Sequence, residues 1–79
     1  MYLYTTTEGK GYIAESDTDL VTTLQARAPH YPTASMYDYM RLVSKWSYVY
    51  AGVEVETHSP EAFVKSMIRN KLLTKEAVQ

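Results

Sequence analysis

The spacing of apolar side chains predicts an amphipathic helix in the middle of the chain. From Ser35 to Trp46 the apolar positions recur every three or four residues, which places them on one face of a helix. Ser35 and Asp38 have the spacing of a capping box, in which a serine hydroxyl accepts a hydrogen bond from a backbone N–H three residues later. We therefore predict a helix that opens at Ser35 and runs through about Trp46.

A second helix is predicted to begin at Ser59-Pro60. Serine is a favoured N-cap, proline suits the first helical position, and Glu61 lies at the positive end of the helix dipole. Asn70 is the expected left-handed terminator, and residues 74–76 are expected to form one last frayed turn. The apolar stripe of this helix consists of Phe63, Val64, Met67, Ile68 and Leu72.

The first residues predict a β-hairpin. Residues 2–7 are rich in tyrosine and threonine, which favour strands, and residues 12–16 read as the return strand. Between them, Gly9 and Gly11 supply the positive φ angles that tight turns need.

Residues 20–28 alternate between apolar and polar positions, as a half-exposed strand does. Because Val21, Thr22 and Thr23 are β-branched, we predict a strand here. A short helix capped by Asp17 or Asp19 is the alternative. The prolines of residues 29–32 predict a loop.

A last strand is predicted over residues 48–56, where apolar and polar side chains alternate. Gly52 interrupts it and favours a bulge or a close backbone approach. The apolar side chains would pack inward: Val49, Ala51, Val53 and Val55. The opposite face would carry Tyr48, Tyr50, Glu54 and Glu56.

Together these elements predict a single α+β domain over residues 1–79. Its small antiparallel sheet of three to four strands would pack against an amphipathic helix, with a C-terminal helix added, in the order ββ(β)αβα. A domain of this size builds one small core, so support from a partner or a second copy is expected.

Composition excludes several kinds of chemistry. The chain has no cysteine, and its two histidines, His30 and His58, stand apart from other ligand types. No serine lies in a recognisable nucleophile motif, and the carboxylates Glu54 and Glu56 lack a cleft suited to acid–base work. We therefore predict no enzymatic activity, no metal and no cofactor. Secretion and membrane spanning are also not expected, since no long apolar run is present.

The charges do not favour nucleic acid as a direct ligand. The formal net charge is −1, and residues 61–79 hold only four basic against two acidic side chains. A phosphate-binding surface needs a clearer positive footprint.

The eight tyrosines favour a protein-binding role. Tyrosine offers a large contact area with few rotatable bonds and is enriched at interfaces. Tyr48, Tyr50, Glu54 and Glu56 would share one strand face, and Tyr37 lies near the polar side of the preceding helix. These five residues are the predicted partner-binding site; for Tyr48 and Tyr50, internal packing under a second layer is an equal alternative.

Residues 46–55, WSYVYAGVEV, resemble the helix-to-last-strand junction of the small T7-like phage proteins that inhibit bacterial host RNA polymerase. The resemblance implies a three-stranded antiparallel sheet on one helix, and an acidic surface that docks on a basic part of the polymerase, with Glu54 as the matched acidic position. Where family members carry functional arginines after the strand, this chain has residues 56–59, ETHS, and its C-terminal helix is additional. The shared positions are Trp46, Tyr48, Val49, Ala51, Gly52, Glu54 and Val55.

From these features we expect a non-enzymatic, protein-binding inhibitor of phage type, acting in the host-cell cytoplasm. Its partner would be a bacterial nucleic-acid enzyme or defence complex, such as RNA polymerase or a CRISPR-type complex, which it would occlude. A small nucleic-acid-binding protein and a structural or assembly homo-oligomer are the alternatives, and a homodimer is left open.

Overall fold

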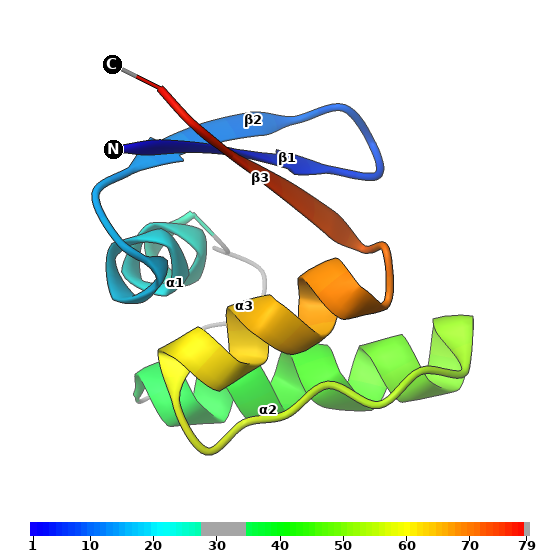
Figure 1. The fold of residues 1–79 in the computed structure, drawn as a ribbon. Helices are drawn as coiled ribbons and strands as arrows, with labels where there is room; N and C mark the ends of the chain where they lie inside the picture. Colours follow the sequence, from blue (N-terminus) through cyan, green and yellow to red (C-terminus); the bar gives the residue numbers. More distant parts are fainter. Residues whose placement is uncertain (28–34, 79) are drawn as a thin grey trace.

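The computed structural model describes residues 1–27 and 35–78, and it confirms a small α+β fold (Figure 1). A three-stranded antiparallel sheet has β1 (Tyr2–Thr6) in its centre, between β2 (Gly11–Ala14) and β3 (Leu73–Ala77). The helices lie on one side of this sheet (Figure 1). They are α1 (Asp17–Ala26), α2 (Met36–Trp46) and α3 (Pro60–Arg69).

The predicted N-terminal hairpin is confirmed. β1 and β2 pair antiparallel, with Tyr4 opposite Tyr12. The turn is closed by the Thr6 N–H, which donates to the Lys10 carbonyl at 2.9 Å, and Gly9 has the positive φ of 86° that favours glycine. The positive φ predicted for Gly11 is wrong, because Gly11 is already the first residue of β2.

The strand predicted over residues 20–28 is wrong for its described part, because α1 occupies residues 20–26; residue 28 lies outside the described residues. Its N-cap is Ser16, whose hydroxyl accepts a hydrogen bond from the Asp19 N–H at 3.1 Å. A cap of this kind satisfies an otherwise unpaired N–H and outweighs the weak cost of β-branched residues inside a helix. The alternative of a short helix is therefore correct, although Ser16 caps it and neither Asp17 nor Asp19 does.

The helix predicted from Ser35 through Trp46 is confirmed as α2. The Ser35 hydroxyl accepts from the Asp38 N–H at 3.1 Å, as the capping pattern predicted. The loop predicted over residues 29–32 lies outside the described residues.

The helix predicted at Ser59-Pro60 is also confirmed, with the Ser59 hydroxyl as its N-cap. Its end differs from the prediction in detail. The left-handed residue is Lys71, with a φ of 62°, whereas Asn70 has a φ of −89°.

Residues 73–77 form β3, so the frayed helical turn predicted over residues 74–76 is wrong. β3 pairs with β1 along its length, with Lys75 opposite Tyr4 and Ala77 opposite Tyr2. The third strand of the sheet is therefore supplied by this segment.

The strand predicted over residues 48–56 is also wrong. α2 continues into a π-helical turn, η1 (Ser47–Ala51), which ends at Gly52 in the left-handed conformation, with a φ of 69°. Residues 53–58 then run back in an extended form beside α2, as Figure 1 shows, but outside the sheet.

This returning segment is held by side-chain hydrogen bonds from the neighbouring helices and not by a β-ladder. Buried backbone polar groups need hydrogen-bond partners, and here serine and asparagine provide them. The bonds run from the Ser44 hydroxyl to the Val55 carbonyl (2.8 Å), from the Glu56 N–H to the Ser66 hydroxyl (3.0 Å), and from the Asn70 amide to the Glu54 carbonyl (3.0 Å).

The core lies between the sheet and the helices as one cluster of buried side chains. Tyr4 occupies its centre on the sheet side, and its side chain is completely buried. Among the described residues, none of the helices combines the length and the apolar character needed to cross a bilayer. The cluster consists of Tyr4, Ala14, Leu20, Val21, Met40, Val55, Phe63, Val64 and Leu73.

Candidate functional site

The turn that follows α2 is held in a defined conformation by its own hydrogen bonds. The Ser47 hydroxyl donates to the Val43 carbonyl at 2.8 Å, and the Gly52 N–H donates to the Tyr48 carbonyl at 3.1 Å. The Val53 N–H then closes the turn on the Ser47 carbonyl at 3.3 Å. The side chains of η1 are therefore presented from an ordered backbone.

Three consecutive large side chains on this turn face solvent. Tyr48 is 63% exposed, Val49 61% and Tyr50 84%. Single exposed apolar residues are common on soluble proteins, but adjacent ones form the kind of patch that marks an interaction site. We call Tyr48, Val49 and Tyr50 the aromatic turn.

All five predicted partner-binding residues are exposed, but the four expected on one strand face do not share one, because no strand forms there. Tyr48 and Tyr50 share the aromatic turn, and Glu54 follows shortly after Gly52 as an exposed residue. Glu56 is exposed farther along, where its N–H bonds to α3. Tyr37 lies in the first turn of α2, about 16 Å along the helix axis from Tyr48 at about 1.5 Å per residue.

The four basic residues of positions 61–79, which are Lys65, Arg69, Lys71 and Lys75, also differ in their environments. Lys65, Arg69 and Lys71 are exposed on or just after α3. Lys75 instead forms an ion pair with Asp17 at 2.9 Å, and its side chain is only 29% exposed. The charge available to phosphate in residues 61–79 is therefore smaller than the sequence count implied.

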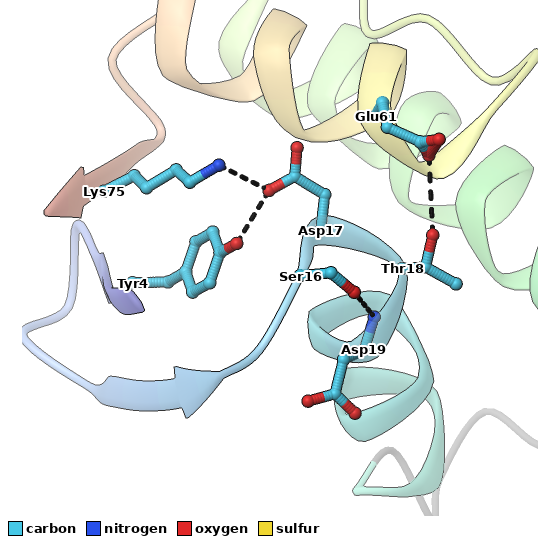
Figure 2. Close-up of polar contacts among 7 residues, drawn as sticks. All are labelled: Tyr4, Ser16, Asp17, Thr18, Asp19, Glu61 and Lys75. Carbon is cyan, nitrogen blue, oxygen red and sulfur yellow. Dashed lines mark hydrogen bonds and ion pairs between the residues drawn. The ribbon is translucent and has the colours of Figure 1, made fainter. Parts of the chain in front are cut away.

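A second polar centre, which the sequence analysis did not find, joins the sheet to the start of α1 (Figure 2). One carboxylate oxygen of Asp17 accepts from the Tyr4 hydroxyl at 2.7 Å and from the Lys75 ammonium at 2.9 Å. The same ammonium lies 4.2 Å from the centre of the Tyr2 ring, within the range of a cation–π contact. We call Tyr4, Asp17 and Lys75 the buried triad after its completely buried member, Tyr4.

Burial raises the pKa of the Tyr4 hydroxyl well above the usual tyrosine range. The hydrogen bond to Asp17 acts in the same direction, because a phenolate beside a carboxylate is unfavourable. Tyr4 is therefore a proton donor that stays neutral, and its hydroxyl serves to hold Asp17.

Asp17 and Lys75 of the buried triad also line an open pocket of about 320 Å³. The sheet contributes Tyr2 and Lys75, while α3 contributes Glu61, which accepts a long hydrogen bond of 3.5 Å from the Thr18 hydroxyl (Figure 2). The remaining wall is the start of α1, residues 15–18. No local sequence signal could have identified this pocket, since its residues come from four separate elements or their flanks.

The acidic stretch from Glu15 to Asp19 belongs to a helix start. The Asp19 carboxylate accepts from the Glu15 N–H at 3.0 Å, and Asp17 belongs to the buried triad. Over residues 1–27 and 35–78, histidine and acidic side chains form no group of three that would suit a metal ion.

No protein-family model, no curated protein and no solved structure matches the chain. The function has to be inferred from its own residues.

Proposed function

We propose that this protein is a non-enzymatic binding protein that docks on another protein through the aromatic turn and acts by occlusion. The observation that carries the proposal is the exposure of Tyr48, Val49 and Tyr50 on a turn whose backbone is already ordered. An ordered turn loses little conformational freedom on binding, so more of its contact energy is available as affinity. Tyrosine is also among the residues that dominate interface energies.

For the partner, we propose a bacterial nucleic-acid enzyme or defence complex. Its support is the resemblance of residues 46–55 to the phage inhibitors of host RNA polymerase, together with the exposed carboxylates of Glu54 and Glu56. The resemblance is one of sequence alone, because η1 replaces the strand that it implied. The two carboxylates would face basic side chains of the partner.

The test uses purified bacterial RNA polymerase and a crude bacterial lysate in parallel. Tagged wild-type protein is expected to retain a protein complex from the lysate, identified by mass spectrometry, or to lower transcription by the purified polymerase. The double variant Tyr48→Ser/Tyr50→Ser should lose at least about tenfold in affinity, since two interface anchors are truncated. The charge reversal Glu54→Lys/Glu56→Lys should weaken binding less and chiefly slow association.

Ile13→Ser is the matched control, because Ile13 is 63% exposed, as Tyr48 is, but lies on β2. It should bind like the wild-type protein. If the captured complex survives the double tyrosine change, the aromatic turn is not the docking surface. If no captured protein depends on these residues for its retention, the proposed function is wrong.

A further inference from the structure

β3 is an edge strand, and part of its backbone has no strand partner within residues 1–27 and 35–78. The Val78 N–H donates to the Met1 carbonyl at 3.1 Å, which fixes the alternation of bonded pairs between β3 and β1. In that alternation, the N–H and C=O groups of Lys75 and Ala77 point away from β1 towards the open edge. Such a row of free groups is a template for an additional strand.

The open pocket lies beneath this edge, on the inner side of the sheet. The Lys75 side chain points to that side, since it reaches Asp17 at the start of α1 (Figure 2). Residues directly opposite each other on neighbouring strands direct their side chains to the same face. A residue of an added strand opposite Lys75 or Ala77 would therefore direct its side chain towards the pocket.

The charge of the pocket determines which kind of side chain can bind there. Three carboxylates and one ammonium line it, which leaves a net charge of −2. The ammonium and Asp17 already satisfy each other, while Glu15 and Glu61 are exposed. The Tyr2 ring adds an aromatic wall, beside which a cation already lies.

We propose that an extended segment of a partner protein adds to the sheet as a fourth strand along β3 and places a basic side chain in this pocket. Backbone hydrogen bonds to Lys75 and Ala77 would supply sequence-independent affinity, and the basic side chain would supply specificity. Arginine fits better than lysine, because its planar guanidinium can bridge Glu15 and Glu61 while it lies against an aromatic ring.

A second copy of this chain fits the edge less well than such a partner. If β3 paired with itself, the basic side chain offered to each pocket would be Lys75 of the other copy. That ammonium is already held by Asp17 and by the Tyr2 ring of its own chain. A partner with an unpaired basic residue loses no existing contact when it binds.

The probe is a blocked synthetic peptide of about seven residues, alternating threonine and valine with a central arginine, which matches the usual length of a strand. Its binding to the full-length protein is followed by fluorescence anisotropy, and the edge is identified by backbone amide resonances and their hydrogen exchange. Exchange should slow at Lys75 and Ala77, while Gly11 and Ile13, on the opposite edge of the sheet, stay unchanged.

Two kinds of variant separate the backbone from the charge. Ala77→Pro removes an N–H from the open edge while the ladder with β1 keeps its bonds, and prolines are tolerated on edge strands. Glu15→Gln/Glu61→Gln removes two carboxylates from the pocket. Each change should weaken the arginine peptide by about tenfold, the effect of losing a charge-assisted or strand-edge hydrogen bond. Glu8→Gln, an exposed carboxylate in the hairpin turn, is the control and should leave affinity unchanged.

A peptide with a central glutamate should bind at least about tenfold more weakly than the arginine peptide. Equal binding of the two peptides, undiminished binding to Glu15→Gln/Glu61→Gln, or slowed exchange on β2 would each overturn the proposal. Absence of binding at about millimolar peptide would do the same. Concentration-dependent dimerisation that protects Lys75 and Ala77 would assign the edge to a second copy. Tyr48→Ser/Tyr50→Ser should bind the peptide normally, so this test does not depend on the aromatic turn.

Discussion

The same residue type has opposite environments at the two ends of the molecule. Tyr4, in the central strand, is completely buried and its hydroxyl holds Asp17, whereas Tyr50, beyond the end of α2, is 84% exposed. At Tyr4 the surrounding protein contacts both the ring and the hydroxyl. At Tyr50 the rest of the protein contacts almost none of the side chain.

This difference separates stability from recognition. A buried, hydrogen-bonded tyrosine contributes its ring area and its polar bond to folding, so its loss is felt by the whole domain. An exposed tyrosine on an ordered turn contributes little to folding and keeps its contact area for a partner. The same substitution should therefore lower folding stability in the buried triad and lower partner binding in the aromatic turn.

The largest expected effect is on folding. Tyr4→Ala should lower the free energy of unfolding by about 3–5 kcal/mol, the usual cost of truncating a buried aromatic residue. In a domain of this size that loss approaches the whole stability. Tyr50→Ala should change it by less than about 0.5 kcal/mol. Urea denaturation followed by circular dichroism measures both, and similar midpoints for the two variants would remove the distinction.

An intermediate effect is expected at alkaline pH. Because the pKa of Tyr4 is raised in the folded protein, the unfolded chain loses this proton first, and folding stability falls as the pH rises above about 10. Tyr4→Phe cannot ionise here. At pH 8 it should be about 1–2 kcal/mol less stable than the wild-type protein, through the lost hydrogen bond. That deficit should shrink by about 1.4 kcal/mol per pH unit once the unfolded tyrosine ionises.

Tyr50→Phe is the control for this pH series, since its hydroxyl is on an exposed side chain. It should follow the wild-type protein at every pH. A constant difference between Tyr4→Phe and wild type from pH 8 to about pH 11 would mean that Tyr4 ionises equally in both states.

The smallest expected effect compares two glycines. Gly9 closes the β1–β2 hairpin and Gly52 ends η1; both have positive φ angles, and an added Cβ at either position meets no atom within 4 Å. Alanine at each should therefore cost only the left-handed backbone strain, about 1 kcal/mol. Equal losses in denaturation would indicate that η1 unfolds with the rest of the domain. A smaller loss for Gly52→Ala would indicate that the turn opens on its own.

Sequence alone could identify the elements whose start is encoded by local chemistry. Ser35 and Ser59 each precede an apolar stripe at helical spacing, and the structure caps both helices there. The same signal is present at Ser16, but the run of β-branched residues that follows it favours a strand. Leu20 and Val21 are both completely buried, one after the other, as the inner face of a helix allows and an alternating strand does not.

The elements that could not be predicted depend on distant partners. Residues 73–77 have no strong strand preference, and they form β3 because the central strand offers them its free edge. Residues 53–58 look like a strand in sequence, yet Ser44, Ser66 and Asn70 bond their backbone in place of a neighbouring strand. Neither choice is visible within a short window of sequence.

The candidate site could be predicted only in part, because it too depends on residues that are distant in the sequence. Residue type and alternation in the sequence single out Tyr48 and Tyr50, although they place them on a strand and the structure has η1 there. Tyr37 does not belong to the same surface, because the length of α2 separates it from Tyr48 and Tyr50. The pocket beside the buried triad required the chain to fold before Lys75 could meet Asp17.

The pairing of β1 with β3 also sets the order in which this protein can be completed during synthesis. The hairpin and the helices need only nearby residues, so they can form as the chain emerges. The central strand must wait for residues 73–77, with one side unpaired in the meantime. A ribosome that stalls before this segment would hold a nascent chain whose middle strand is open to pairing with other chains.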